Sequence, residues 1–331
     1  MAFPPENRAK TTPTAPSGSS KKRTTLKILV ASGLLAWLVG TGRLDLHALL
    51  ATPLSTLHLL GILVLFIGMV LQAWRWWWLL AVQGIDLSFP RTLGLVWIGR
   101  FLAVMLPGVV GGDLVRGYYV ILEAPAAKTA GVSTVVLDRM MGFVASFVLG
   151  LFALAWMSGS HEPWKGPVLH VGAVSVLCVF GASLAFLALW IDPVRNRILG
   201  FVPGRYRGPL KTVLEGYRGR GRTLWACLAL SLAIGFMGMG AFVVAGHLIG
   251  SPVGWKRAFL VCPLVFVATA LPLSPSGIGV GETAASVLFA QFGVETGATL
   301  MLIVRLWFLV LQLPGGLLYV LRRGRPQQAA E

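Results

Sequence analysis

The sequence predicts an all-α polytopic membrane protein, and three observations support this fold class. Of the 331 residues, 56% are hydrophobic and only 12% are charged, whereas a soluble globular domain carries about 25% charged residues. The mean hydropathy is +0.78. Several apolar runs reach the length of about 20 residues that a helix needs to cross a bilayer. This composition excludes disorder, a collagen-like chain and a disulfide scaffold, and it argues against an ordinary cytosolic enzyme.

The strong positive charge of the chain has a membrane explanation. Lys and Arg number 28 against 12 Asp and Glu, which gives a formal net charge of +16. These cations flank the apolar segments and form no stripe with interleaved aromatic residues, so we expect no nucleic-acid partner. Cations at the ends of spans are what the positive-inside rule and anionic lipid headgroups produce.

The chain begins with a predicted disordered, basic cytoplasmic tail over residues 1–25, which is rich in Pro, Ser and Thr. A membrane domain is predicted over residues 26–322, and residues 323–331 form a C-terminal cytoplasmic tail. The first apolar run is interpreted as an uncleaved span, because the tail before it is long and no cleavage site stands out. The six predicted full spans are 28–42, 56–82, 132–157, 167–191, 224–249 and 298–321.

Charge determines the predicted topology. The loop 192–222 holds eight Arg and Lys residues against two acids, which places it, with both tails, in the cytoplasm. The loops 43–55, 158–166 and 250–256 are nearly uncharged and are expected to face outward. The chain between the second and third spans must therefore enter and leave the membrane from the cytoplasm.

Two re-entrant hairpins satisfy this constraint. The first lies between the second and third spans, and the second, over residues 257–293, enters and leaves from the outer face. Both are broken by Gly and Pro, which interrupt helices and permit tight turns. The residues predicted to make the turns are Pro107, Gly111 and Gly112 in the first hairpin and Pro272, Gly277 and Gly279 in the second.

The two halves of the membrane domain share one order of elements. Each half, about 26–157 and about 167–321, consists of two spans, a hairpin and a third span, and the second half is inverted relative to the first. Inverted repeats with Gly/Pro-interrupted segments indicate a transporter with a site near the bilayer midplane. The alternative interpretation is that both turns are packing kinks in an ordinary helical bundle.

Charged residues within apolar segments are the candidate binding residues. A charge at a helix centre costs about 2.5–3.5 kcal/mol on insertion scales, so such residues face a cavity or a partner. The predicted substrate-binding residues are Arg100, Asp113, Arg116, Asp138, Arg139, Glu282 and Arg305.

Arg100, Asp113 and Arg116 belong to the first hairpin, and Asp138 and Arg139 lie a few residues into the span that follows it. Arg100 and Arg116 stand before and after the turn of this hairpin and form a candidate clamp for a phosphate. Asp113 and Arg116, three residues apart, share one face of a helix that starts after the glycines, although Asp113 equally fits a helix N-cap. A mutual or cross-helix ion pair is the plainer interpretation of Asp138 and Arg139.

The remaining charges lie elsewhere in the domain. Glu282 follows the second glycine-rich turn and is expected to cap a half-helix, bind a headgroup amine or carry a coupling proton, with Arg305 as its partner. Arg75 stands within Trp74–Trp78 near the end of its span. We interpret it as a snorkelling arginine in an aromatic belt.

The sequence offers no motif for metal, cofactor or covalent chemistry. The five histidines are scattered, and Cys178, Cys227 and Cys262 lie in apolar runs without metal or redox spacing. Walker, G-x-S-x-G and Ser-His-Asp arrangements are absent from the sequence. We expect no metal, no cofactor and no catalytic residue, and any transport is expected to be passive or driven by an ion or potential gradient.

Three motifs together resemble those of a known family. Residues 106–116 (LPGVVGGDLVR), 137–142 (LDRMMG) and 275–282 (PSGIGVGE) are similar, in order and spacing, to the lysylphosphatidylglycerol synthase transmembrane family. This flippase-like domain occurs in bacterial multiple-peptide-resistance proteins and as stand-alone proteins. The likeness covers residues 25–322 and implies an integral membrane domain that moves a charged lipid between leaflets. The residues it favours are Pro107, Gly111, Gly112, Asp113, Arg116, Asp138, Arg139, Gly277, Gly279 and Glu282.

Two departures from the family pattern bear on function. Asp138 stands where the family more often has Glu, which keeps the charge with a shorter reach. No soluble acyltransferase-like domain follows the last predicted span, so we do not expect aminoacylation of phosphatidylglycerol. Stand-alone relatives are associated with hopanoids and with polyprenyl-linked or glycosylated lipids, so the resemblance does not imply one lipid.

The predicted function is that of a lipid translocase in the bacterial plasma (inner) membrane. Its substrate is a charged, polyprenyl-linked or glycosylated lipid, with an anionic or zwitterionic headgroup, that passes through a midplane cavity. The alternatives are an intramembrane lipid-modifying transferase and a non-catalytic scaffold of a lipid-modifying complex. The short outer loops argue against the transferase. Besides lipids, a second copy of the chain and a separate lipid-modifying enzyme stay open as partners.

Overall fold

The computed structural model consists of helices joined by turns, and no strand occurs in the part of the chain that it describes. The predicted N-terminal tail, the first span, nearly all of the span 167–191 and the tail beyond Arg323 lie outside the described residues, as do Pro107 and Pro272. The described residues are 55–105, 111–158, 191–200, 203–270, 274 and 277–323.

Four helices are long and apolar enough to cross a membrane. They coincide with four of the six predicted spans, and a helix of 27 residues such as α3 is about 40 Å long. Large apolar side chains such as Phe152, Trp225 and Leu313 are more than 60% exposed, as expected of surfaces in contact with lipid. The all-α polytopic membrane fold is therefore confirmed. The four helices are α3 (Thr56–Val82), α6 (Lys128–Ser158), α10 (Gly221–Leu248) and α13 (Gly297–Arg323).

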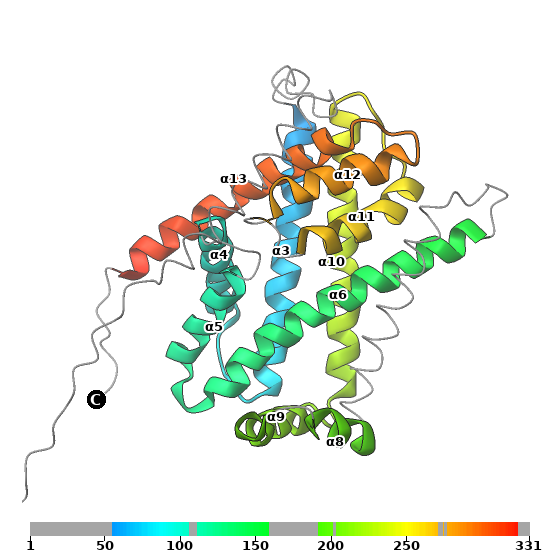
Figure 1. Ribbon diagram of the computed structural model, residues 1–331. Coiled ribbons are helices and arrows are strands. Elements are labelled where there is room, and N and C mark those ends of the chain that lie inside the picture. Colours follow the sequence, from blue (N-terminus) through cyan, green and yellow to red (C-terminus); the bar gives the residue numbers. More distant parts are fainter. Residues whose placement is uncertain are drawn as a thin grey trace, which may run out of the picture.

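Helices α3 and α10 run side by side along the middle of the molecule (Figure 1). Small residues permit their close approach, because Gly68 of α3 packs against Met237 and Gly240 of α10 packs against Val64. Helices in membranes commonly associate through such small residues. This pair forms the centre of the described helical bundle.

The first predicted hairpin is a pair of short helices, α4 (Phe89–Met105) and α5 (Gly111–Glu123). With 13 residues, α5 is about 20 Å long and too short for a full crossing. Gly99 and Gly112 bring the two backbones together, because a Cβ atom at either position would lie 2.9 Å from the carbonyl oxygen of the other. A short 3-10 helix, η1 (Pro125–Ala127), leads from α5 into α6.

The second predicted hairpin consists of α11 (Trp255–Ala270) and α12 (Val280–Ala290). In the described part of its turn, Gly277 and Gly279 have φ angles of +68° and +79°, a backbone conformation that favours glycine. The predicted inverted repeat stays a prediction, since one span of each half lies outside the described residues.

The basic segment 192–222 differs from the predicted loop. It contains two short helices, α8 (Asp192–Gly200) and α9 (Gly204–Gly216), which lie at the end of the bundle where α3 ends and α10 begins (Figure 1). Both are too short and polar for the hydropathy pattern to detect. Their exposed cations include Arg197, Arg207 and Lys211.

The C-terminal half of α13 is attached to the first hairpin. Gly315 packs on the carbonyl oxygen of Trp97 in α4. At the far end, Glu123 of α5 forms ion pairs with Arg91, at 2.7 Å, and with Arg322 of α13. The α4–α5 hairpin is thus held to α13 at two places, one apolar and one charged.

Candidate functional site

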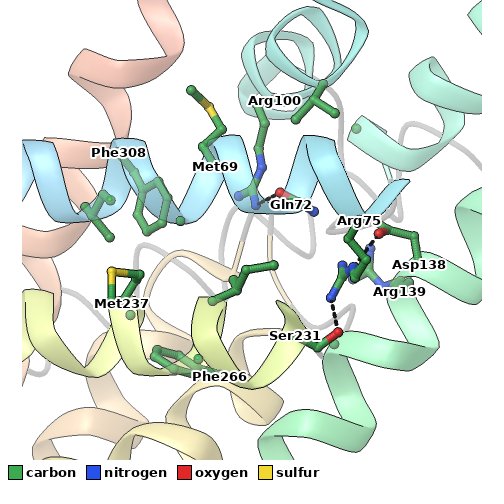
Figure 2. Close-up of a pocket in the computed structure, with 18 of the residues that line it drawn as sticks. Met69, Gln72, Arg75, Arg100, Asp138, Arg139, Ser231, Met237, Phe266 and Phe308 are labelled. Atoms are coloured by element: carbon green, nitrogen blue, oxygen red, sulfur yellow. Dashed lines mark hydrogen bonds and ion pairs between the residues drawn. The ribbon is translucent and has the colours of Figure 1, made fainter. Parts of the chain in front are cut away.

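A cavity of about 410 Å³ lies among the helices. Its volume falls within the range of about 300–1,000 Å³ typical of small-molecule sites. Figure 2 shows charged side chains at one end, including Arg75, Asp138 and Arg139, and the apolar Met237, Phe266 and Phe308 at the other. The lining residues come from α3, α4, α5, α6, α10, α11 and α13.

The charged lining of the cavity is unbalanced. It consists of four arginines and two aspartates, so the described lining residues carry an excess of two positive charges. Five of these six residues are among the seven predicted binding residues. The six are Arg75, Arg100, Arg116, Arg139, Asp113 and Asp138.

Asp138 of α6 connects three helices at the charged end of the cavity. Arg75 Nε of α3 donates to Asp138 Oδ1 at 2.7 Å, and Arg116 Nη1 of α5 donates to Asp138 Oδ2 at 3.0 Å. The Asp138 side chain is only 1% exposed. A carboxylate at this depth is tolerated because it is paired and hydrogen-bonded.

Arg75 is a cavity-lining residue that the sequence interpretation missed. Its side chain is 4% exposed and also donates from Nη1 to Ser231 Oγ of α10 at 2.7 Å. The interpretation as a snorkelling belt arginine is therefore wrong. The available signal was the position of Arg75 around the helix axis, because residues three or four positions apart share one face of a helix. The cavity-lining face of α3 consists of Leu65, Gly68, Met69, Gln72 and Arg75.

Asp113 forms the second bridge between the hairpin and α6. Its carboxylate contacts Arg116, with 3.4 Å between Oδ1 and Nη1, and forms an ion pair with Arg139. The predicted shared face of Asp113 and Arg116 is confirmed. The N-cap alternative for Asp113 is wrong, because α5 already begins at Gly111. Neighbouring helix residues point apart, so Asp138 and Arg139 pair across helices and not with each other.

Arg116 is buried with part of its guanidinium unpaired. The side chain is 4% exposed, and its Nε and Nη2 atoms are buried without a hydrogen-bond partner in the described structure. The guanidinium carbon lies 4.1 Å from the ring centroid of Trp76. Thr134 Oγ1 accepts a hydrogen bond from Trp76 Nε1 at 3.0 Å, which fixes the indole. Arg116 is therefore fixed in position, and two of its donor nitrogens, Nε and Nη2, have no acceptor in the described structure.

Arg100 of α4 has only neutral partners. Its Nη2 donates to Gln72 Oε1 at 2.6 Å, and its guanidinium carbon lies 5.6 Å from the ring centroid of Phe308. Within the described residues no carboxylate lies at ion-pair distance from it. The adjacent Gly99 packs against the stem of Arg116, because a Cβ atom there would lie 2.9 Å from Arg116 Cγ. Arg100 and Arg116, the two arginines of the predicted clamp, therefore line the same cavity and lie on two helices that are in contact.

Glu282 and Arg305 form a separate buried pair. Arg305 Nε donates to Glu282 Oε1 at 2.6 Å, and Arg305 Nη2 donates to the Gly277 carbonyl oxygen at 3.0 Å. The Gly279 N–H donates to Glu282 Oε2 at 2.7 Å, so Glu282 caps α12 as predicted. Neither residue lines the cavity described above. The structure thus divides the seven predicted residues into a cavity group of five and this pair.

Comparison with known proteins gives a family match over most of the chain. The family described as the lysylphosphatidylglycerol synthase TM region matches residues 24–316, a range that includes the cavity and the Glu282–Arg305 pair. The chain is also similar to a UPF0104 membrane protein of Pyrococcus horikoshii, with 23% identity over 72% of this chain and 77% of that protein. No solved structure matches the chain significantly.

Proposed function

This chain belongs to the lysylphosphatidylglycerol synthase TM region family, and from that premise we propose that its cavity binds the anionic headgroup of a membrane lipid and that the protein moves this lipid between leaflets. The observation that carries the proposal is the excess of two positive charges at one end of a cavity formed by membrane helices. Charge in such surroundings is costly and commonly marks a substrate path.

The two ends of the cavity support a lipid over a soluble anion. Its charged end suits a headgroup, whereas Met237, Phe266 and Phe308 at the other end suit apolar atoms close to that headgroup (Figure 2). An inorganic anion has no apolar atoms that could contact the apolar end. A lipid places both kinds of atom side by side.

The donor chemistry favours an anionic headgroup over a zwitterionic one. Arginine binds phosphate oxygens through paired N–H groups, and Arg100 has no acidic partner among the described residues. Asp113 and Asp138, the acids that could receive an amine, are each engaged by two arginines. A headgroup amine therefore finds no uncompensated acid in this cavity.

The proposed setting is the bacterial plasma membrane, with both termini and the basic α8–α9 segment in the cytoplasm. Positive-inside asymmetry supports this orientation. Movement of the lipid is proposed to be passive or driven by an ion or potential gradient, through rocking of the half that contains the α4–α5 hairpin against the half that contains the α11–α12 hairpin.

A reconstituted assay tests the proposal. Proteoliposomes carry fluorescent phosphatidylglycerol, phosphatidylethanolamine or a polyprenyl phosphate, and an impermeant reductant measures how fast label leaves the inner leaflet. The expected result is protein-dependent movement of the anionic lipids. No movement of any of the three by folded, monodisperse protein contradicts the translocase proposal and favours the scaffold or transferase alternatives.

Arg100→Gln is the variant of choice for this assay. Because the partners of Arg100 are neutral, its replacement leaves no buried acid unpaired. A charge-assisted hydrogen bond contributes about 1.5–3 kcal/mol, so we expect movement to slow by about tenfold or more. Arg257→Gln, at an exposed position of α11 that does not line the cavity, is the matched control and should move lipid at the wild-type rate.

A further inference from the structure

We infer that the cavity selects a lipid whose headgroup ends in a phosphomonoester, with two negative charges, over a phosphodiester lipid with one. This inference rests on the proposed function and specifies the substrate class of the same site. It follows from which arginines of the cavity are paired with its two aspartates and which are not.

The two acids of the cavity are fully occupied by three of its arginines. Asp138 is shared by Arg75 and Arg116, and Asp113 by Arg139 and Arg116. Among the described residues, Arg100 contacts the neutral amide of Gln72 and the ring of Phe308 and forms no ion pair. The excess of two charges therefore remains after every ion pair of the cavity has been made.

A low-dielectric site binds most tightly the ligand that neutralises it. Charges interact more strongly there than in water, and a buried charge without compensation is strongly disfavoured. A phosphodiester brings one negative charge and leaves one cation uncompensated. A phosphomonoester at alkaline pH brings two and balances the cavity.

The number of available donors supports the same class of ligand. On Arg116, Nε and Nη2 lie on one edge of the guanidinium and have no acceptor, so this edge can bind two oxygens in parallel. Arg100 commits Nη2 to Gln72 and has further N–H groups. A terminal phosphate presents three non-bridging oxygens to two arginines, whereas a diester presents two.

The test compares two lipids that differ in the headgroup alone. Neutral phosphatidylcholine proteoliposomes carry acyl-labelled phosphatidic acid, a monoester, or phosphatidylglycerol, a diester with the same acyl chains. Rates are measured at pH 8 and corrected with protein-free liposomes. The expected result is that the protein moves phosphatidic acid at least tenfold faster than phosphatidylglycerol.

Lowering the pH changes the ligand charge without changing its size. The second pKa of a phosphomonoester is about 6, so at pH 5.5 most of the phosphatidic acid carries one charge, while phosphatidylglycerol keeps one at both pH values. We expect the rate ratio to fall several-fold at pH 5.5. The phosphatidylglycerol rate at the two pH values reports any effect of pH on the protein itself.

The variants separate this inference from the proposed function. Arg100→Gln removes one of the two excess charges and should bring the rate ratio at pH 8 close to one, while Arg257→Gln keeps it. Equal wild-type rates for the two lipids overturn the inference and leave the translocase proposal standing. Movement of neither lipid overturns the inference, and it overturns the translocase proposal as well when the polyprenyl phosphate of the first assay also fails to move.

Discussion

Asp138 is the residue that holds the charged end of the cavity together. It is almost completely buried and is the ion-pair partner of both Arg75 and Arg116. Its two carboxylate oxygens are each used by a different helix. Removing its charge therefore leaves Arg75 without its ion-pair partner Asp138, and it leaves Arg116 with Asp113 alone, at 3.4 Å.

Asp138→Asn is expected to lower the free energy of unfolding by about 3–5 kcal/mol, the usual cost of breaking a buried ion pair from one side. Thermal unfolding of the purified protein in detergent measures the change. Glu215→Gln is the control, because Glu215 is 47% exposed and lies 3.9 Å from Lys211. An exposed pair of this kind contributes at most about 1 kcal/mol. Similar small losses in both variants would show that the network does not stabilise the fold.

Single charges in apolar surroundings were the strongest residue-level signal in the sequence. Arg305 is a charged residue within its predicted span, and its partnership with Glu282 is confirmed. Arg75 was missed because its tryptophan neighbours also fit an aromatic belt. Trp74 is 42% exposed whereas Trp76 is fully buried, so the run contains both kinds of surface. Composition alone does not show on which side of the helix the arginine lies.

At the scale of the elements, glycines determine how closely the short helices approach the long ones. A Cβ atom on Gly315 of α13 would lie 2.3 Å from the carbonyl oxygen of Trp97 and 3.0 Å from Phe101 Cβ. These contacts leave no space for a methyl group, and the nearest of them is to backbone, which cannot rotate away. Gly94 lies in α4, the helix that contains Trp97 and Phe101, and a Cβ atom at this position would have nothing within 4 Å.

Gly315→Ala and Gly94→Ala are therefore expected to change stability in opposite directions. Overpacking at Gly315 should cost about 1–3 kcal/mol, whereas alanine at Gly94 should stabilise α4 by up to about 1 kcal/mol through its higher helix propensity. Melting temperatures of the two variants measure both effects. A stabilising or neutral Gly315→Ala would contradict the close contact between α13 and α4.

Hydropathy predicted the long helices well and the polar ones poorly. The run 56–82 became α3 with the same bounds, because polar residues mark its ends and its interior is apolar apart from Gln72 and Arg75. Helix α5 carries Asp113, Arg116 and Glu123 and followed only from the parity of the spans. Helices α8 and α9 were predicted as loop, because short polar helices have neither apolar length nor strong periodicity.

The topology of the whole molecule can be tested with two cysteines. In a background in which the three native cysteines are replaced by serine, Arg218→Cys marks the α8–α9 end and Glu295→Cys marks the turn between α12 and α13. Both positions are exposed. The positive-inside rule places the first in the cytoplasm, and the parity of the spans places the second outside.

An impermeant maleimide should label Glu295→Cys in intact cells and Arg218→Cys only in inverted vesicles. Detergent-solubilised protein, in which both positions must react, is the control for reactivity. Labelling of both from the same side would contradict the parity argument and with it the second hairpin.

For the whole molecule, the sequence predicted the fold class and the family but not the grouping of the charges. Seven residues were predicted as one site, and the structure separates Glu282 and Arg305 from the other five. This separation depends on how α12 and α13 are inclined to the first hairpin. Angles between helices arise from contacts such as Gly315–Trp97, which involve residues far apart in the chain.

The polar contacts at the charged end of the cavity join the α4–α5 hairpin to α3 and α6. Arg100, Asp113 and Arg116 lie on the α4–α5 hairpin, and they contact Gln72, Arg139 and Asp138 on α3 and α6. The same two arginines therefore anchor the hairpin and carry the remaining N–H groups that we propose bind a headgroup. A ligand that draws Arg116 from Asp138 weakens this anchorage, and by linkage a loosened hairpin binds the ligand more tightly. In the proposed function, binding of the headgroup and loosening of the hairpin are therefore coupled, and each is expected to favour the other.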